Sequence, residues 1–265
     1  MIGFIGAGNM GFAILKGMLE KGINPQEICV YDKNISTLEK LKALGITILD
    51  SSLEVARKSN FLFIAVKPNI YDAVLNEVKD VITNDKIVIT IAAGYEVSKV
   101  QSILGDKKIV RTMPNTPALS LEGFTAIYFN EHITDNEKNE VINLLESFGK
   151  CSVVDKEELI NAYSAVSGSG PAYVSIMIEA MADAAVLLGV PRKDAYLLSE
   201  QTILGTAKLA LDTESHPGVL KDMVCSPGGT TIEGVRTLEE KGFRSALIEC
   251  IINTYKKNLD IKNIR

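Results

Sequence analysis

Hydrophobic and polar positions in the first 155 residues alternate between short apolar runs and helical repeats. Short β-branched runs predict strands at 2–5, 28–31, 47–49, 61–66, 87–91, 109–112, 126–129 and 152–154. Apolar residues spaced by three or four positions predict helices at 10–21, 36–44, 53–58, 70–81, 97–104 and 135–148. Strands that alternate with helices in this way indicate βαβ units and a parallel sheet.

The pattern changes after residue 155, where strand-like runs give way to long stretches rich in Ala, Leu, Ile and Met. Helices are predicted at 172–188, 193–211, 219–224, 231–241 and 243–258. We therefore predict two domains, an α/β domain over 1–155 and an all-helical domain over 156–265. An alanine cluster at 180–185 predicts close helix packing and a possible subunit interface.

The composition is that of an ordinary globular protein. The chain has 265 residues, of which 46% are hydrophobic, and its formal net charge is −5. Because no dense run of Lys and Arg occurs, a nucleic-acid partner is not expected. The apolar stretches 61–66 and 184–190 are far shorter than the roughly 20 residues of a membrane span, so a membrane partner is not expected either.

Cysteine and histidine usage bears on compartment and metal binding. The four cysteines lie far apart without a CxxC motif, and the chain has two histidines. This pattern predicts neither a disulfide framework nor a metal site. The first residues form a glycine motif rather than a signal peptide. A reducing, cytoplasmic location is therefore expected.

A glycine-rich segment follows the first predicted strand and opens the first predicted helix. Its residues are Gly6, Ala7, Gly8, Asn9, Met10 and Gly11. In this context the backbone turns tightly and brings its N–H groups against a pyrophosphate. A glycine turn that only packs a helix on a strand is the alternative, which the strand–loop–helix order disfavours. The α/β domain is thus predicted to be a Rossmann-type dinucleotide-binding domain.

The second predicted strand ends at Asp32, where an acidic side chain commonly accepts hydrogen bonds from the adenosine ribose. Asp32 favours NAD over NADP. Lys33 follows immediately and could pair with a 2′-phosphate. The sequence therefore leaves the choice between NADH and NADPH open.

Three further segments follow predicted strands at the carboxyl edge of the sheet, where ligands of open α/β sheets bind. They are Ala65-Val66-Lys67-Pro68, Ala92-Ala93-Gly94, and the loop from Met113 to Pro117 that contains Asn115. Each also has a structural interpretation. Pro68 suits a helix start, Lys67 could be a solvated charge, and the small residues could serve packing alone.

The sequence indicates no hydrolase site, because His132 and His216 lie in unrelated contexts and neither is near a serine elbow. Two segments, 167–173 and 226–231, precede predicted helices and resemble anion-binding helix starts. Ordinary N-capping is the alternative for either segment alone. Two such segments in one domain favour a carboxylate-binding function.

The whole chain resembles the pyrroline-5-carboxylate reductase family. The resemblance extends from GFIGAGNMG through AVKP, AAG, MPNTP and SGSGPAY to HPGVLKDMVCSPGGTTIEGV, and the last segment is the most specific. It implies NADPH- or NADH-dependent reduction of 1-pyrroline-5-carboxylate to L-proline, the last step of proline biosynthesis. It also implies a homodimer or higher homo-oligomer whose helical domains intertwine, with the active site between the cofactor domain and the partner subunit.

The resemblance also implies residue roles. The cofactor would be held by the glycine segment together with Ser52, Ala65, Val66, Lys67, Pro68, Ala92, Ala93, Gly94 and Asn115, in addition to Asp32 and Lys33, which are predicted from their place after the second strand. The substrate would be bound by Glu214, Ser226, Pro227, Gly228, Gly229, Thr230 and Thr231. The hydroxyl of Thr231 would contact the ring nitrogen and act as the catalytic group. Small hydroxyl residues often occupy the positions of Asp32 and Lys33 in the family.

Two other functions are weighed against the reductase. A β-hydroxyacid dehydrogenase-like enzyme would need a catalytic lysine in the helical domain, for which Lys208 and Lys221 are candidates. A non-catalytic dinucleotide sensor would bind the cofactor without turnover. A sensor has no need for a carboxylate site, so segments 167–173 and 226–231 favour the enzyme.

Overall fold

The computed structural model describes residues 1–92 and 94–264, with side chains described up to residue 260. Within this range the chain divides into two compact units. Unit 1 runs from Met1 to Gly168 and takes in the C-terminal segment from Tyr255. Unit 2 runs from Ser169 to Thr254. This division falls thirteen residues after the predicted domain boundary at 155, and it also separates the two halves of the last helix.

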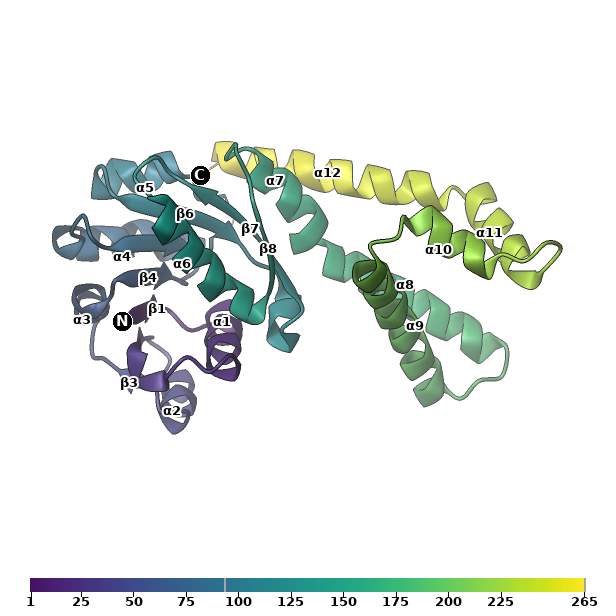
Figure 1. Ribbon diagram of the computed structural model, residues 1–265, viewed down its shortest axis with the longest axis horizontal. Coiled ribbons are helices and arrows are strands. Elements are labelled where there is room, and N and C mark those ends of the chain that lie inside the picture. Colours follow the sequence, from purple (N-terminus) through teal and green to yellow (C-terminus); the bar gives the residue numbers. More distant parts are fainter. Residues whose placement is uncertain (93, 265) are drawn as a thin grey trace. The chain divides into compact units, whose positions relative to one another are not determined.

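Unit 1 is built on one eight-stranded sheet (Figure 1), which has the strand order β3-β2-β1-β4-β5-β6-β7-β8. The strands are β1 (Ile2–Ile5), β2 (Ile28–Tyr31), β3 (Thr47–Ile48), β4 (Phe61–Ile64), β5 (Ile87–Thr90), β6 (Lys108–Met113), β7 (Gly123–Phe129) and β8 (Gly149–Val153). All neighbouring strands pair in parallel except β6 and β7, which are antiparallel. The order 3-2-1-4-5-6 is that of the Rossmann fold, so the predicted fold class is confirmed.

Helices cover both faces of this sheet. They are α1 (Asn9–Glu20), α2 (Ile35–Ala43), α3 (Ser52–Lys58), α4 (Tyr71–Val78), α5 (Val97–Leu104), α6 (Asp135–Leu145) and α7 (Leu159–Tyr163). Buried side chains of α1, α2 and α6 form one apolar cluster with the sheet, and those of α3, α4 and α5 form a second. Successive strand residues alternate between the two clusters, as Ile28 and Cys29 do, because side chains of a strand point to opposite faces.

The sheet differs from the sequence prediction at its far edge. A wholly parallel sheet was expected, but Val110 to Met113 of β6 pair with β7 in antiparallel register. The chain between these strands contains no long α-helix, only a short 3₁₀ segment, Thr116–Ser120. A crossover of that length is too short to return a strand in parallel, so the direction reverses. Hydrophobic patterning alone does not encode strand direction.

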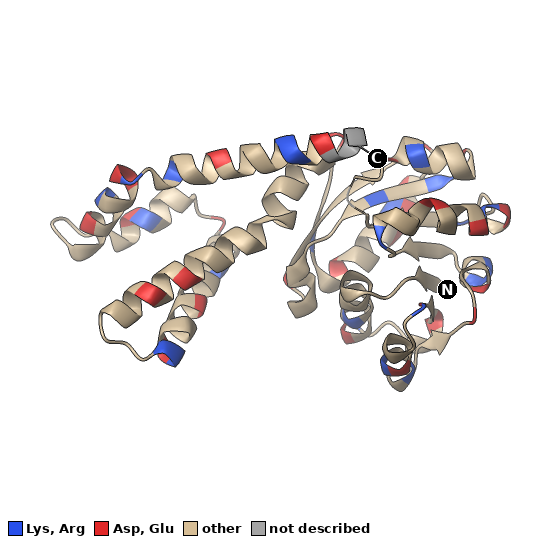
Figure 2. Ribbon diagram, turned by 180° about the vertical axis from the view of Figure 1, so that it is seen from behind, with Lys and Arg blue, Asp and Glu red and all other residues tan. Residues whose placement is uncertain are grey.

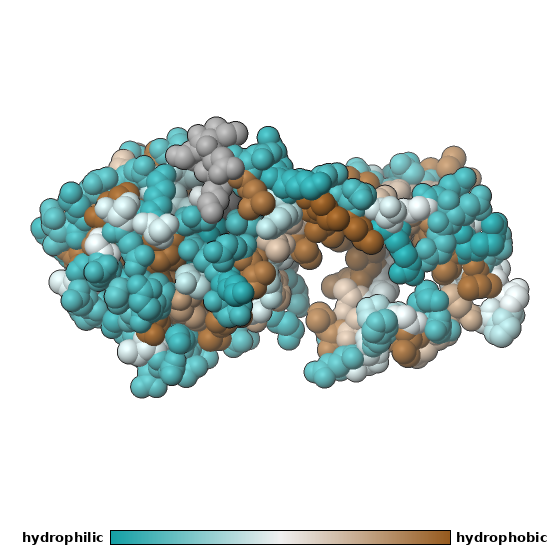
Figure 3. All heavy atoms as spheres, turned by 90° about the horizontal axis from the view of Figure 1, so that it is seen from above, coloured by the Kyte–Doolittle hydropathy of each residue, from teal (hydrophilic) through white to brown (hydrophobic). Residues whose placement is uncertain are grey.

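Unit 2 is entirely helical in its described residues. It contains α8 (Gly170–Leu187), α9 (Arg192–Thr213), α10 (Pro217–Val224), α11 (Thr230–Glu240) and the first half of α12 (Phe243–Ile264). Small residues at the contact let α8 and α9 approach closely, because Ala182, Ala195 and Ser199 are fully buried there. Few other apolar side chains of this unit are buried, and brown apolar surface lies over its helices (Figure 3).

Charged side chains are spread over both units. Lys and Arg alternate with Asp and Glu along the described helices, with no extended run of one sign in the view of Figure 2. Several of them form exposed pairs within one helix, such as Lys208 with Asp212 and Arg236 with Glu240. Such pairs support helices by only about 0.3–0.5 kcal/mol each.

Candidate functional site

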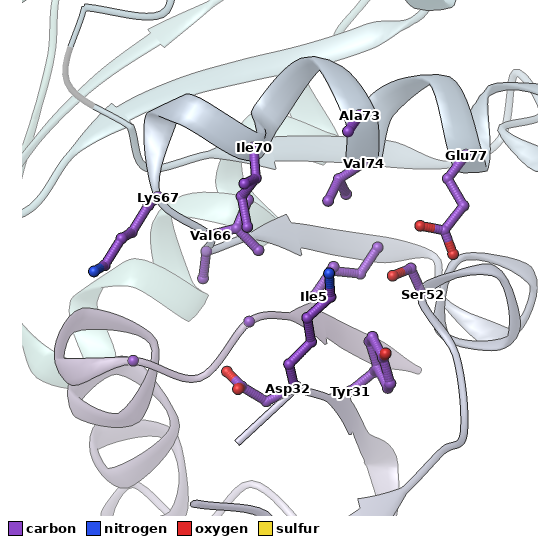
Figure 4. A pocket seen from close by; sticks show the side chains of 14 residues that line it. Ile5, Tyr31, Asp32, Ser52, Val66, Lys67, Ile70, Ala73, Val74 and Glu77 are labelled. Atoms are coloured by element: carbon purple, nitrogen blue, oxygen red, sulfur yellow. The ribbon is translucent and has the colours of Figure 1, made fainter. Parts of the chain in front are cut away.

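A cavity of about 390 Å³ opens at the carboxyl ends of β1, β2 and β4 in unit 1. This volume lies within the roughly 300–1,000 Å³ of typical ligand pockets. Figure 4 shows side chains of the loops after β2 and β4, and of α4, around it. The cavity is lined by Ile5, Gly6, Gly8, Tyr31, Asp32, Lys33, Ser52, Ala65, Val66, Lys67, Ile70, Ala73, Val74 and Glu77. It therefore lies where the strand order reverses, which is where open α/β sheets bind ligands.

The glycine loop between β1 and α1 fits a pyrophosphate. Gly6 has a φ of 92°, and a Cβ there would lie 2.7 Å from the carbonyl oxygen of Ala65. Only glycine allows this close approach of the two loops. Helix α1 begins at Asn9, and its N-cap Gly8 provides no side-chain cap. The N–H groups of its first turn are therefore available to an anion, and the helix dipole favours negative charge there.

Asp32 is held between two backbone donors. Its Oδ2 accepts a hydrogen bond from the N–H of Ala7 at 2.6 Å, and its Oδ1 accepts one from the N–H of Asn34 at 2.7 Å. Figure 4 shows the carboxylate directed towards the loop that joins β1 to α1. The half-buried side chain thus ties the glycine loop to the loop after β2, and each oxygen keeps a second lone pair for a ligand.

Tyr71 connects the ends of β4 and β5, from which two predicted cofactor loops begin. Its hydroxyl donates to the carbonyl oxygen of Ile64 at 2.5 Å and accepts from the N–H of Ile91 at 3.2 Å. The side chain is fully buried, and this burial raises the pKa of Tyr71 above its usual value. The hydroxyl therefore stays protonated at neutral pH and holds both loops in place. The sequence analysis did not single out Tyr71.

The cavity brings together many of the predicted cofactor residues. Those that line it are Gly6, Gly8, Asp32, Lys33, Ser52, Ala65, Val66 and Lys67. Ala7, Asn9, Met10 and Gly11 belong to the same loop and helix start, and Pro68 begins the 3₁₀ turn that follows Lys67. Ala92 and Gly94 follow β5 instead, and Ala93 lies outside the described residues.

The amide of Asn115 is used within unit 1. Its Nδ2 donates to the carbonyl oxygen of Ser167 at 3.0 Å, and its Oδ1 accepts from the N–H of Phe124 at 2.8 Å. The side chain is 8% exposed. These bonds give Asn115 a role in shaping its loop, and its contact with the nicotinamide stays a prediction.

One wall of the cavity was missed from the sequence. Ile70, Ala73, Val74 and Glu77 line it from α4 and the turn before it, and Tyr31 closes the opposite side. The first four are spaced by three, one and three positions, which places them on one face of a helix. That spacing was readable, because the helix follows the predicted cofactor loop directly.

The second predicted site lies in unit 2, at the start of α11. Gly229 is the N-cap of this eleven-residue helix and adopts an extended conformation without a side-chain cap. A Cβ on Gly229 would lie 2.3 Å from the Oγ of Ser226, so a larger residue there would force the Ser226 hydroxyl to move. The hydroxyls of Thr230 and Thr231 are exposed and form no hydrogen bond within the described part of the chain. The helix start therefore presents unpaired donors.

Glu214 caps the C-terminus of α9 in the left-handed region, with a φ of 52°. Left-handed backbone is uncommon for a residue other than glycine and is often found at functional sites. Its side chain is exposed. This observation is compatible with the predicted substrate contact of Glu214, which stays a prediction.

The segment 167–173 does not form the predicted helix start. Helix α7 continues through a π-helical turn, Ser164–Gly168, directly into α8, so that residues 159–187 form one helical run. The backbone N–H groups around Ser169 therefore fall inside a helix, and Ser169 provides no side-chain cap. The expectations of an anion site and of an N-cap are therefore both wrong for this segment. Pro171, at the second position of α8, lies where the earlier helical turns continue into α8 and not at the start of a separate helix.

The two lysines weighed as dehydrogenase catalysts are exposed ion-pair partners. Lys208 pairs with Asp212 at 2.9 Å, one helical turn away, and Lys221 pairs with Asp222 at 2.6 Å. The pairing with Asp222 raises the pKa of Lys221. A lysine that must exchange protons near neutral pH needs the opposite environment.

The sheet topology and the glycine-lined cavity define a dinucleotide-dependent oxidoreductase with an added helical unit. The chain is 47% identical to the pyrroline-5-carboxylate reductase of Escherichia coli K12, over 97% of this chain and 96% of the relative. It belongs to the pyrroline-5-carboxylate reductase family. Residues 157–261 match the family model for pyrroline-5-carboxylate reductase dimerisation, and residues 1–94 match the model for coenzyme F420-dependent NADP oxidoreductases.

Solved structures agree with this assignment. A pyrroline-5-carboxylate reductase from Coxiella burnetii superposes with a TM-score of 0.94 at 34% identity, covering 98% of this chain and 97% of that one. A pyrroline carboxylate reductase from Plasmodium falciparum, solved with NADP bound, has a TM-score of 0.85 at 31% identity and covers 97% and 96% of the two chains.

The helical run from Leu159 to Leu187 bears on the expectation that no segment spans a membrane. By length and composition alone this run could cross one, and 6% of its most apolar window is buried. The run arises because α7 and α8 are continuous, which the sequence did not predict. It lies within the dimerisation region, where exposed apolar side chains are expected, so its hydropathy by itself does not indicate a membrane.

Proposed function

We propose that this chain reduces 1-pyrroline-5-carboxylate to L-proline with NADPH or NADH, as the last step of proline biosynthesis. The observation that carries the proposal is the combination, in a member of this family, of a dinucleotide cavity in unit 1 and an uncapped helix start in unit 2. The bound dinucleotide supplies a hydride from nicotinamide C4 to the imine carbon.

Residues of unit 1 bind and orient the dinucleotide. The first-turn N–H groups of α1 bind its pyrophosphate, and Asp32 with Lys33 meets the adenosine ribose. Ser52 and the segment from Ala65 to Pro68 line the cavity beside it. Ala92, Ala93, Gly94 and Asn115 complete the proposed cofactor set. None of these residues is proposed to act as an acid or base at the nicotinamide ring, and their contribution to the rate is orientation.

Residues of unit 2 bind the imino acid. The N–H groups at the start of α11, together with Ser226, Pro227, Gly228, Gly229 and Thr230, hold the carboxylate. Glu214 contributes a further polar contact. The hydroxyl of Thr231 meets the ring nitrogen and stabilises the proton that makes the imine carbon electrophilic. Thr231 is thus the proposed catalytic residue.

The chain is proposed to act as a homodimer or higher homo-oligomer in the cytoplasm. The match of residues 157–261 to a dimerisation family and the exposed apolar side chains of unit 2 support self-association. The four cysteines are free, as in a protein of a reducing compartment.

The test is a spectrophotometric assay of the purified full-length chain. Loss of NADH or NADPH absorbance upon addition of 1-pyrroline-5-carboxylate, with L-proline identified as the product, is expected. A protein that binds the dinucleotide but consumes neither cofactor with this substrate would instead be a sensor or another dehydrogenase. The six-membered ring analogue, tested in parallel, defines how narrowly the site selects ring size.

A further inference from the structure

The adenosine end of the cavity has a charge arrangement that bears on cofactor choice. The charged residues that line the whole cavity are Asp32, Lys33, Lys67 and Glu77, and the described lining residues include no Arg. Sites for a 2′-phosphate commonly provide an arginine near the ribose, whereas a carboxylate at the end of the second strand accepts from an unphosphorylated ribose.

The position of Asp32 is fixed rather than adjustable. Its two oxygens accept from the N–H groups of Ala7 and Asn34 at 2.6 and 2.7 Å. Turning the carboxylate aside to admit a phosphate would break both hydrogen bonds and leave two backbone donors unpaired. The negative charge therefore stays beside the ribose position whichever dinucleotide is offered.

Three backbone N–H groups near the predicted ribose position already have acceptors. Ala7 and Asn34 donate to Asp32, and the N–H of Ser36 donates to Oδ1 of Asn34, which is the N-cap of α2. The start of α2 is therefore capped by its own side chain, in contrast to the start of α1. A phosphate at this point would lie against the carboxylate of Asp32 and beside N–H groups that already donate to other acceptors.

Lys33, the cation that could attract a 2′-phosphate, would bind it only weakly. Lys33 is exposed, on a flexible stem, and makes no hydrogen bond or ion pair with any described residue. Exposed ion pairs of this kind contribute about fivefold or less to an equilibrium. Glu77, directed to the Ser52 side of the cavity in Figure 4, adds a second exposed carboxylate to the wall. Because Lys33 and Lys67 offset Asp32 and Glu77 in the lining, the fixed carboxylate of Asp32 beside the ribose, and not a net charge, is what disfavours a further dianion.

We propose that this cavity selects the unphosphorylated ribose, so that the chain uses NADH in preference to NADPH, and that Asp32 is the residue that sets this choice. The inference rests on the proposed function only in taking the ligand to be a nicotinamide dinucleotide. It goes beyond that function by naming which dinucleotide is used and why.

The test is direct binding of NADH and NADPH to the full-length chain by calorimetry, without imine substrate. We expect NADH to bind at least about tenfold more tightly than NADPH, because the phosphate charge meets that of Asp32. Since charge repulsion is screened by salt, the preference should shrink between low and high ionic strength. Tighter binding of NADPH, or a preference independent of salt, would overturn the proposal.

Variants assign the preference to Asp32. Asp32→Asn keeps the side-chain shape and removes the charge, and Asp32→Ser shortens the side chain as well. Both are expected to lower the NADH-to-NADPH affinity ratio at least about tenfold, while Lys33→Ala raises it. Glu140→Gln removes one charge at an exposed position of α6, outside the cavity, and should leave the ratio unchanged. An unchanged ratio in both folded Asp32 variants would overturn the assignment.

The binding experiment separates this inference from the proposed function. If NADH is preferred but no imine is reduced, the cofactor inference stands and the proposed reaction fails. If the imine is reduced but NADPH binds more tightly, the reaction stands and the inference fails.

Discussion

Thr231 presents a side-chain hydroxyl with no partner in the described part of the chain, on the first turn of α11. Its exposure means that the fold does not need the hydroxyl. A group that the fold does not need can be removed without unfolding the protein, which makes its catalytic contribution measurable.

Thr231→Ala is expected to lower kcat for 1-pyrroline-5-carboxylate about ten- to hundredfold. This is the range expected when a hydrogen bond to a charged group, about 1.5–3 kcal/mol, is lost in the transition state. Steady-state kinetics together with a thermal melt measure this effect, and Tm should be unchanged.

Two further variants control for effects on the helix. Thr231→Ser restores the hydroxyl and should recover most of the activity. Thr237→Ala removes another exposed hydroxyl of α11, one that donates to the carbonyl oxygen of Glu233, and should not change kcat. Full activity of a folded Thr231→Ala variant would refute the catalytic role.

The sequence identified which residues could contact the ribose, but it did not show how their side chains are held. Asp32 was recognised as a ribose contact, yet the sequence left it balanced against Lys33. The hydrogen bonds from Ala7 and Asn34 decide which of the two is fixed, and they depend on backbone positions from two separate loops. Residue patterns do not specify such distances.

At the scale of elements, the loops after β4 and β5 depend on one buried side chain. Tyr71 sits at the first position of α4 and bonds the ends of both strands. Its ring also packs against that of Tyr95, with centroids 4.5 Å apart. Helix α4 therefore holds the start of the Ala65–Pro68 segment through Tyr71, while other residues of the same helix line the cavity.

Tyr71→Phe is expected to lower the free energy of unfolding by about 1–3 kcal/mol, because it leaves a buried carbonyl and a backbone N–H without their partner. The loosened loops should also raise the Kd for NADH severalfold. Denaturant unfolding and calorimetric titration measure the two effects.

Tyr95→Phe is the matched control. Tyr95 is the ring that packs against Tyr71, and its hydroxyl donates to Asp72. Among the described residues, this hydroxyl forms no hydrogen bond with the end of β4 or β5, so its removal leaves both strand ends bonded. Stability should fall in this variant too, but the Kd for NADH should not change. Equal Kd changes in both variants would mean that Tyr71 acts only through general stability.

Elements with strong periodicity could be predicted, and their connections could not. The strand–helix alternation through β5 matches the predicted ranges closely, because each element repeats one clear hydrophobic period. The sequence analysis missed the antiparallel direction of β7 and the π-helical turn at Ser164–Gly168. Both depend on how short segments join their neighbours, which periodicity does not describe.

At the scale of the whole molecule, unit 2 exposes more apolar surface than a solitary domain is expected to leave in water. On α9 the leucines at 197, 204 and 211 recur every seven residues and are 63%, 56% and 60% exposed. A seven-residue repeat keeps side chains on one face of a helix. The match of residues 157–261 to a dimerisation family supports self-association of this region, and we predict that the leucine row belongs to the contact with a second copy of the chain.

Leu204→Glu places a charge at the middle of this leucine row and is expected to shift the protein from oligomer to monomer. Burying an unpaired carboxylate in an apolar interface costs several kcal/mol, enough to change association by orders of magnitude. Sedimentation velocity over a range of concentrations measures the state. Thr206→Glu introduces the same charge at an exposed polar position on the opposite face of α9 and should leave the oligomer intact.

NADH binding distinguishes loss of association from loss of folding. The described residues that line the dinucleotide cavity all belong to unit 1, so the Leu204→Glu monomer should still bind NADH with the affinity of the parent. A variant that no longer binds NADH has unfolded and says nothing about the interface. A variant that binds NADH and still sediments as an oligomer would show that the leucine row of α9 lies outside the contact, because an unpaired charge at its centre would then have been tolerated.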